Sequence, residues 1–312
     1  MYREIIAIGG SAGSLSALTE IMAALPSDCS AAVFVVIHIP SYQKSHLAEV
    51  LAAKGAFPAI QVSESQPIQK GKVYVAPPDS HMLIDVGRVY PWRGPKEDRQ
   101  RPAINPLFRS AAESYGAKVV GVVLSGALQD GSAGLWKIKQ RGGLAVVQDP
   151  QTAPVRDMPE SVLEYVEADH VLNSQGIGSL LQKLSCDSAG NRPVDSRLET
   201  DSMETKVLLE ARCPDCQGPL SEVRYGDVHE FRCLVGHAFS PQNILQAQSE
   251  VEENALWSAV AAIEESITLI RRLLPHLPST ARKPFEEQIA KRFELAREAR
   301  NIIERLDSMQ AH

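Results

Sequence analysis

Short apolar runs alternate with helical patterns along the first 185 residues. Ile5–Ile8 is an apolar run, small residues follow it, and from Leu15 apolar residues recur at helical spacing. Further strand candidates are 32–37, 59–62, 119–124 and 143–148, and helix candidates are 45–54, 106–115 and 173–185. Residues 72–76 and 81–90 suggest a strand pair with a turn at 85–88, and 93–101 suggests an exposed loop. Repeated strand–helix units predict an α/β fold, with a doubly wound and mostly parallel sheet covered on both faces.

Beyond residue 185 the composition of the chain changes at two points. Residues 186–206 are polar and suggest a linker, in which Cys186 has no assigned role. Residues 207–245 contain cysteine and histidine at knuckle spacing, and 246–312 follow a helical pattern. With 312 residues there is room for about two domains and smaller modules. We therefore expect a catalytic-type domain over 1–185, a linker over 186–206, a small module over 207–245 and helices over 246–312.

The helical tail carries two apolar seams. In the first, six residues step by four and three positions: Leu256, Val260, Ile263, Ile267, Ile270 and Leu274. Pro275–Pro278 interrupts it, and a second helix carries Ile289, Phe293, Ala296, Ile303 and Leu306. This pattern is typical of an antiparallel helical hairpin. The seams can simply bury each other, but so small a core favours docking to a partner helix or to a second copy.

Three residue types used in ester hydrolysis follow predicted strands. Ser11 follows the first strand within Gly9-x-Ser11-x-Gly13, His38 follows the second, and Asp130 follows the strand at 119–124. Carboxyl ends of parallel strands share one edge of a sheet, which is where doubly wound folds bind ligands. A serine needs a base to take its proton, and a carboxylate to orient that base. The pattern therefore predicts a Ser–His–Asp site.

Two other interpretations of the first turn remain open. A dinucleotide site would need glycines where Ser11 and Ser14 stand, and an acidic residue ~20 positions further on. Alternatively, the two serines could merely cap the following helix. Of the other polar residues, we expect His81 to be structural, and Arg101 either to line a substrate cleft or to lie on a mobile loop.

A metal site is predicted in the third segment. Cys213, Cys216, Cys233 and His237 follow a C-x2-C-x16-C-x3-H spacing around a hairpin at 225–227. Four such ligands suit tetrahedral Zn²⁺, and a closed set predicts a structural rather than a catalytic metal. His229 is a second choice of ligand, and a redox pair of Cys213 and Cys216 is the alternative.

Composition excludes some function classes. The formal net charge of −6 argues against binding driven by nucleic-acid phosphates. No apolar run approaches the ~20 residues of a membrane span. The first strand begins at Ile5, which leaves no room for a signal peptide, so we expect a cytoplasmic protein without a disulfide framework.

The motifs together resemble the catalytic domain of the chemotaxis receptor methylesterases, the CheB type of protein-glutamate methylesterase. The matching residues are Ile8–Gly13, Ile37–Pro40, Tyr74–Met82, Arg101-Pro102, Leu124–Gly126 with Asp130-Gly131, and Met158-Pro159. The resemblance implies that Ser11 is the nucleophile, His38 the general base and Asp130 its orienter. It also implies oxyanion donors from the backbone of Ala12 and Ala127, no catalytic cofactor, and a methylated chemoreceptor as substrate.

The chain departs from the best-known members of this family at two places. It has Ala12 where they have Thr, and Ala127-Leu128 where they have Met-Gly. It also resembles a stand-alone form, because the first strand leaves no room for the receiver domain that they carry. We therefore expect a carboxylic ester hydrolase that demethylates receptor glutamates, and deamidation of glutamines by the same site is left open. A non-catalytic signalling scaffold on a degenerate esterase fold, or a hydrolase of another ester, are the alternatives.

Overall fold

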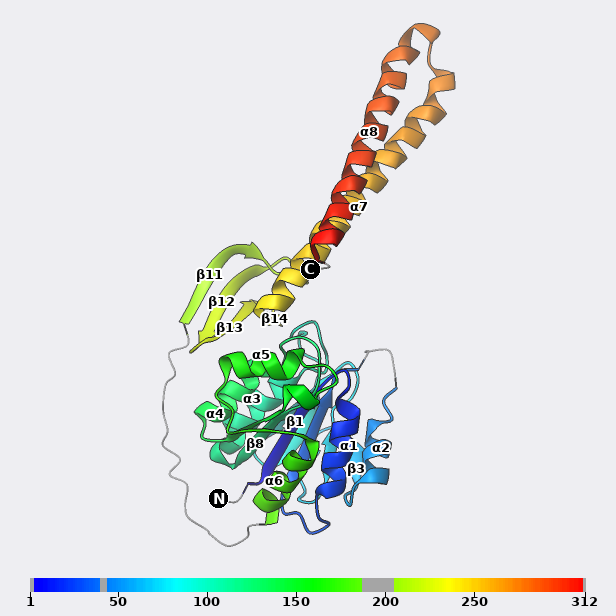
Figure 1. Cartoon of the computed structure of the whole chain (residues 1–312). Coiled ribbons are helices and arrows are strands. Elements are labelled where there is room, and N and C mark those ends of the chain that lie inside the picture. Colours follow the sequence, from blue (N-terminus) through cyan, green and yellow to red (C-terminus); the bar gives the residue numbers. More distant parts are fainter. Residues whose placement is uncertain (1–2, 40–43, 187–204, 311–312) are drawn as a thin grey trace. The chain divides into compact units, whose positions relative to one another are not determined.

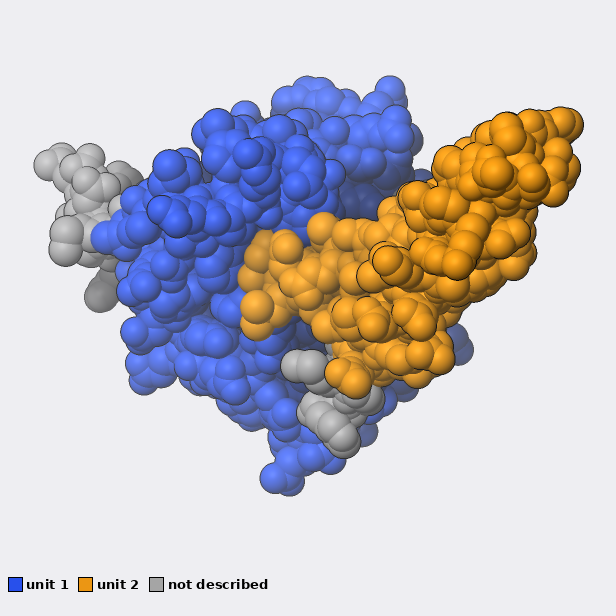
Figure 2. Space-filling model, turned by 90° about the horizontal axis from the view of Figure 1, so that it is seen from above, with its two compact units in different colours: residues 1–243 blue, residues 244–312 orange. Residues whose placement is uncertain are grey.

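The computed structural model describes residues 3–39, 44–186 and 205–310. It divides into two compact units, residues 1–243 and 244–312, which Figure 2 colours separately. None of the helices in the described ranges combines the length and the apolar character that crossing a bilayer requires.

A seven-stranded sheet forms the centre of the first unit (Figure 1). Its order is β10-β9-β8-β1-β2-β5-β3, and every neighbouring pair is parallel. The strands are β1 (Ile5–Gly10), β2 (Ala32–Ile37), β3 (Ala59–Gln61), β5 (Val73–Val75), β8 (Val119–Val123), β9 (Leu144–Gln148) and β10 (His170–Leu172). The chain leaves β1 towards β2 on one side and later returns to β8 on the other. The carboxyl edge at β1 is therefore the topological switch point, where such sheets bind ligands.

Helices cover both faces of this sheet. Alternate residues of β1 point to opposite faces, so that Ile6 and Ile8 join one apolar cluster and Ile5 and Ala7 the other. The first cluster is covered by α1 (Ser14–Ala24), α2 (Leu47–Lys54) and α6 (Ser174–Cys186). The second is covered by α3 (Ile104–Tyr115), α4 (Ser132–Gln140) and α5 (Asp157–Tyr165). Two short 3-10 turns, η1 (Gly116–Lys118) and η2 (Pro150–Thr152), precede β8 and follow β9. The doubly wound, mostly parallel fold predicted from the sequence is confirmed.

A small antiparallel sheet lies beside α3. It has the order β4-β7-β6, from β4 (Gln66–Pro67), β6 (His81–Asp85) and β7 (Arg88–Trp92). The turn predicted at 85–88 is present, but it joins β6 to β7. The pairing predicted between 72–76 and 81–90 is wrong, because the buried strand β5 pairs with β2 and β3 of the central sheet.

A four-stranded antiparallel sheet, which we call the ribbon, follows in the same compact unit. It consists of β11 (Thr205–Arg212), β12 (Pro219–Tyr225), β13 (Val228–Cys233) and β14 (Ala238–Phe239). The predicted hairpin at 225–227 is present, with Gly226 at a positive φ of 60°. Most of the predicted linker, residues 187–204, lies outside the described residues, and β11 begins within its last two positions.

The ribbon packs directly on the catalytic-type domain. Tyr225 lies against Trp136 of α4, with ring centroids 5.8 Å apart. Val223 and Val228 belong to the same apolar cluster as α3 and α4. Because this surface is covered, the two parts share one core rather than forming separate globules.

Polar contacts complete this packing and correct one prediction. Asp98 donates its N–H to Ala238 O at 2.7 Å, and its carboxylate accepts the N–H of Ser240 at 2.6 Å. Arg109 of α3 pairs with Glu97 and lies 3.7 Å from Glu230 of the ribbon. The loop 93–101 was predicted to be exposed, but Glu97 and Asp98 are only 6% and 4% exposed. The prediction is wrong at these positions because the ribbon covers them.

The helices α7 (Pro241–Leu273) and α8 (Ser279–Gln310) form an antiparallel hairpin, joined through η3 (Leu274–His276) (Figure 1). The predicted seams are buried at Val260, Ile267, Ala296 and Ile303. Phe293 is an exception, since it is 46% exposed and lies beside Arg271 instead.

Candidate active site and metal centre

Ser11 lies in a tight turn between β1 and α1, and the flanking glycines are required by packing. A Cβ on Gly9 would lie 2.4 Å from Ile104 Cγ2, so only glycine lets α3 approach β1 this closely. Gly13 has a φ of +77°, and a Cβ there would lie 2.8 Å from Pro154 Cβ. Both glycines of the Gly9-x-Ser11-x-Gly13 motif therefore have a structural reason that involves no nucleotide.

Hydrogen bonds hold the backbone of this turn. The buried Ser14 hydroxyl donates to Ser11 O at 2.6 Å, and the Ser11 N–H donates to Ser125 O at 2.9 Å. Ser14 therefore braces the turn. The Ser11 hydroxyl itself makes no hydrogen bond to any described residue, so it is available to a substrate or a base.

His38 follows the neighbouring strand at the same level of the sheet. Gly10 is the register partner of Ile37, and the His38 N–H donates to Gly10 O at 3.2 Å. Ser11 and His38 are thus the next residues along two paired parallel strands. The His38 side chain is 9% exposed.

Asp130 is fully buried and receives three hydrogen bonds. Its Oδ2 lies 2.7 Å from His38 Nε2 and 2.6 Å from the N–H of Ile104, and its Oδ1 accepts the Asn105 N–H at 3.0 Å. Ile104 and Asn105 open α3, so the carboxylate occupies a helix N-terminus, which favours negative charge. Burial by itself would raise the pKa of Asp130, but the donors from His38 and α3 outweigh it and hold that pKa below its usual value. Asp130 is therefore a carboxylate suited to accept from an imidazole N–H.

The predicted triad is assembled in part. Asp130 and His38 are in contact, and Ser11 lies at the adjoining strand end. Because Asp130 takes Nε2, the nitrogen left for a serine is Nδ1. The described residues include no hydrogen bond between Ser11 Oγ and His38, so that contact stays a prediction.

The backbone N–H groups of Ala12 and Ala127, near Ser11, have no hydrogen-bond partner among the described residues. They are the predicted oxyanion donors, and that role also stays a prediction. Gly126 lets the loop approach the nucleophile, because a Cβ there would lie 2.8 Å from Ser11 Cβ. Leu128 has a φ of 68°, in the region that favours glycine, and it stands where the resemblance expects glycine.

Arg101 and His81 have defined structural contacts. The Arg101 guanidinium bonds Asp79 Oδ1 at 2.6 and 3.0 Å and Gly94 O at 2.7 Å. Hydrogen bonds from Arg101, together with Arg93, lower the pKa of Asp79. His81 is buried: its Nδ1 accepts the Ala103 N–H, and its Nε2 lies 2.8 Å from Pro95 O. A cleft role for Arg101 remains a prediction, while both ring nitrogens of His81 are used within the fold.

Sequence reasoning missed three buried polar residues around the site. Asn105 binds Asp130 through its N–H, and its Oδ1 accepts from Gly131 and Gly134 at 3.2 and 2.7 Å. Ser125 Oγ lies 2.8 Å from Ala12 O, and the Ser125 N–H donates to Gln148 Oε1 at 2.9 Å. Asn105-Pro106 at a helix start and Gln148 at a strand end were visible signals, but nothing local links them to Asp130 or Ser11.

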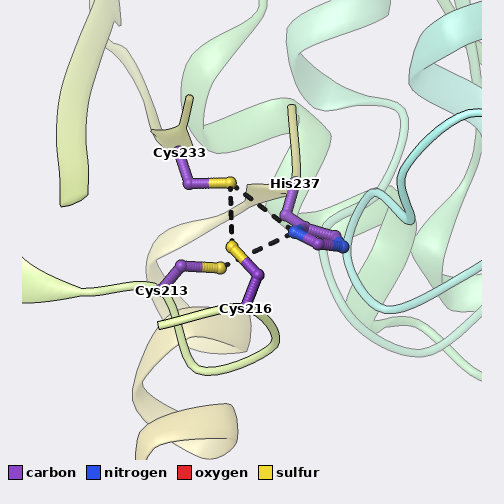
Figure 3. A group of neighbouring side chains, drawn as sticks. All are labelled: Cys213, Cys216, Cys233 and His237. Atoms are coloured by element: carbon purple, nitrogen blue, oxygen red, sulfur yellow. Dashed lines mark hydrogen bonds between the residues drawn. The ribbon is translucent and has the colours of Figure 1, made fainter. Parts of the chain in front are cut away.

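The four predicted metal ligands lie together. Their candidate ligand atoms are all within 4.8 Å of one another, and Figure 3 shows three sulfurs and the His237 ring converging on one point. Cys216 Sγ is 3.6 Å from Cys233 Sγ, and His237 Nδ1 is 3.5 and 3.8 Å from the sulfurs of Cys233 and Cys213. A tetrahedral zinc with metal–sulfur bonds of about 2.3 Å needs sulfur–sulfur separations of about 3.8 Å. The donor set and its spacing therefore fit Zn²⁺.

Two tight turns position these ligands. In the first, the Cys213 N–H donates to Gly218 O at 2.8 Å, and in the second the Gly236 N–H donates to Cys233 O at 3.1 Å. Gly236 adopts a φ of +106°. Burial and the neighbouring sulfurs raise the pKa of Cys213 to about 12, so a thiolate there needs a cation. His229, the second choice, lies 2.7 Å from Glu222 and outside the cluster.

The fold and the strand-end site are those of an α/β ester hydrolase, and comparison with known proteins narrows this class. The family model described as CheB methylesterase matches residues 6–181. A putative protein-glutamate methylesterase/protein-glutamine glutaminase of Leptospira interrogans is 38% identical over 185 residues, covering 59% of this chain and 96% of that protein. Protein-glutamate methylesterase/protein-glutamine glutaminase 2 of Methanosarcina mazei is 35% identical over 178 residues, covering 54% of this chain and 48% of that protein.

A solved structure agrees with these relatives. The CheB methylesterase catalytic domain of Thermotoga maritima matches with a TM-score of 0.56 and 32% identity, covering 59% of this chain and all of that one. The family model covers more than half of the chain, and the chain belongs to the CheB methylesterase family. The resemblance inferred from the motifs is confirmed.

Proposed function

We propose that this protein is a protein-glutamate methylesterase that hydrolyses glutamyl methyl esters on a chemoreceptor-like protein and releases methanol. Its family and the names of its relatives support a carboxylic ester hydrolase. The observation that carries the proposal is the 2.7 Å contact between His38 and an Asp130 that is buried and held at the start of α3. A degenerate scaffold would have no need to keep a buried carboxylate aimed at an imidazole.

In the first half of the reaction, Ser11 Oγ attacks the ester carbonyl while His38 Nδ1 takes the hydroxyl proton. Asp130 accepts from Nε2–H, which fixes the tautomer and stabilises the imidazolium. The N–H groups of Ala12 and Ala127 receive the oxyanion. When the carbonyl re-forms, the alkoxy oxygen takes the proton from His38 and leaves as methanol.

In the second half, water replaces the alcohol. His38 takes a proton from the water, which attacks the acyl-Ser11 carbonyl. Collapse then returns the proton to Ser11 Oγ and releases a glutamate side chain. The same steps with a glutamine substrate release ammonia, so deamidation requires no further residue, as the names of the relatives suggest.

The test is methanol release from a methylated chemoreceptor fragment by wild type and Ser11→Ala. Loss of a serine nucleophile costs roughly 10⁶ in kcat, so Ser11→Ala should be inactive while its thermal unfolding is unchanged. Ser16→Ala is the matched control, because it removes an exposed hydroxyl from the same segment. Near-wild-type methanol release by Ser11→Ala would overturn the proposal.

Substrate choice needs a second comparison. If wild type hydrolyses small aryl esters but leaves the receptor fragment methylated, then the protein is a hydrolase of another ester. If wild type catalyses neither reaction but still binds the fragment, then the scaffold alternative is favoured. Ammonia release from a glutamine-bearing fragment measures the deamidase activity.

We further propose that Cys213, Cys216, Cys233 and His237 hold a structural zinc. The sulfur and nitrogen spacings support tetrahedral coordination, and four protein ligands leave no position for a reacting water. Asp215 lies 3.9 Å from His237 Nε2, where it can help to orient the ring.

A further inference from the structure

The helical hairpin exposes a second apolar stripe beside its buried seam. On α7, each stripe residue immediately precedes a seam residue, and the stripe follows an adjacent face that is interrupted once, at the half-buried Ser266. On α8, Leu295 and Ile302 likewise precede the buried Ala296 and Ile303. The stripe consists of Ala255, Ala259, Ala262, Leu269 and Leu273 on α7 with Leu295 and Ile302 on α8, all of them exposed.

Contacts between the helices show that the two halves of the stripe lie on one side of the hairpin. On the other side, Arg300 pairs with Glu264, and Arg271 lies 4.9 Å from the Phe293 ring. Glu264 and Arg271 directly follow the seam residues Ile263 and Ile270, whereas stripe residues directly precede seam residues, so the stripe occupies the opposite side of α7. In an antiparallel pair, residues that precede the seam on both helices share one side, which places Leu295 and Ile302 on the side of the stripe. The same antiparallel register places Leu295 level with Leu269 and Ile302 level with Ala262.

The stripe is uneven along its length. Towards the turn of the hairpin it presents the large side chains of Leu269, Leu273 and Leu295, which are 60%, 58% and 53% exposed. Towards the other end α7 presents three alanines, and Ile302 of α8 lies level with Ala262. On α7, large side chains at one end and small ones at the other form a surface that is complementary to itself when it is turned end over end.

The charged residues of α7 are also distributed unevenly, with acidic side chains at the alanine end of the stripe and basic side chains at the leucine end. The exposed Glu252 lies three positions before Ala255, and the exposed Arg272 lies beside Leu273, the last leucine. An end-over-end arrangement brings the acidic end of one α7 to the basic end of the other. A parallel arrangement instead sets like charges together and leaves space between the alanines.

We propose that the hairpin of one chain pairs with the hairpin of a second copy through this stripe, as an antiparallel four-helix bundle with two-fold symmetry. The leucine end of each stripe packs over the alanine end of the other. The proposal concerns the assembly of the chain and does not rest on the esterase activity.

The test is the mass of the full chain by sedimentation equilibrium over a range of concentrations. Wild type should weigh twice the 34.0 kDa of the single chain. Ala259→Glu places a charge in the stripe and should weaken dimerisation at least ~100-fold. Ala261→Glu is the matched control, since it adds the same side chain to an exposed position two residues away on another face, and it should remain dimeric. Helix content by circular dichroism should be equal in both variants.

A charge exchange tests the orientation. Glu252→Arg and Arg272→Glu should each weaken the dimer roughly fivefold, and the double variant should restore it. These residues are about 30 Å apart along one helix, so rescue can arise only between two chains.

Three outcomes would overturn the proposal: a monomeric wild type at 100 µM or so, equal effects of the two alanine variants, or a failure of the charge exchange to rescue. A monomer whose KM for the receptor fragment rises with Ala259→Glu alone would assign the stripe to the substrate. Hydrolysis of a small aryl ester should be unchanged in every variant.

Discussion

Replacing Asp130 by asparagine removes the negative charge of the buried carboxylate and keeps a side chain of almost the same size and shape. Asp130 Oδ2 receives two donors, from His38 and Ile104, and Oδ1 receives one, from Asn105. An asparagine has one acceptor oxygen, so the best arrangement places it at the Oδ2 position. The amide NH₂ then faces the Asn105 N–H, and one buried donor loses its partner.

This geometry gives two magnitudes. An unsatisfied buried N–H costs about 1–3 kcal/mol, so the free energy of unfolding of Asp130→Asn should fall by about that amount. The His38 tautomer is retained in this arrangement, but the imidazolium loses its counter-charge. Replacing a triad aspartate by asparagine lowers kcat by up to about 10⁴, or about 5.5 kcal/mol of barrier, when the tautomer is lost as well, so this value is the upper limit here. We expect a fall of 10² to 10⁴-fold, roughly, in kcat with little change in KM.

The assay is steady-state methanol release, paired with urea unfolding of the same preparations. Asp169→Asn is the control, because Asp169 also accepts a backbone N–H, from Ala145 at 2.7 Å, but precedes β10 at the opposite edge of the sheet. It should lose stability and keep its kcat. If Asp130→Asn retains kcat within threefold or so while Asp169→Asn does not, the role assigned to Asp130 is wrong.

Three further predictions concern the metal, a buried acid and a loop. Purified protein should contain one zinc per chain by elemental analysis, and Cys213→Ser should lose it. Burial and the charge of Asp130 raise the pKa of Asp98 to about 7, so the folded state keeps a proton that the unfolded state loses. The contribution of Asp98 to stability should therefore fall as pH rises towards 7, and Asp98→Asn should flatten the melting temperature measured from pH 5 to 8. Gly126→Ala should lower kcat by displacing Ser11, whereas Gly87→Ala, where a Cβ meets nothing within 4 Å, should change only stability.

The central fold followed from local signals. Buried strands such as β1 and β8 are continuous apolar runs, and the helices between them show their own periodicity, so element type and the carboxyl edge were predictable. Ser11, His38 and Asp130 were predictable for the same reason, since each directly follows such a run. The four candidate metal ligands, which the structure brings together, were chosen from spacing alone, because knuckle turns are local structures.

Errors arose where distant segments meet. Residues 93–101 are polar and resemble a surface loop. Glu97 and Asp98 are buried by the ribbon and the residues just after it, of which Ser240 lies 142 positions after Asp98 in the chain. Asn105 shows the same limit: its bond to Asp130 depends on α3 approaching β1 over Gly9. Phe293 fits an apolar periodicity, but its position in the hairpin is decided by the partner helix and Arg271.

The shared core of the ribbon and the catalytic domain has a thermodynamic consequence. The family match ends at residue 181, yet Val223, Tyr225 and Val228 complete an apolar cluster that contains residues of α3, α4 and α5. A metal that binds only the folded ribbon stabilises the ribbon against unfolding. Because the ribbon and the catalytic-type domain share one apolar cluster, the same binding also stabilises that domain. With the zinc that we propose at the four candidate metal ligands, a chelator should therefore lower the melting temperature of the esterase domain and the ribbon as one cooperative transition, although the proposed ligands include no residue of the esterase site. For the same reason, a chain shortened after Leu184 would expose Trp136 and leave Arg109 without Glu230, so the smallest sound catalytic fragment of this protein ends near Asn243.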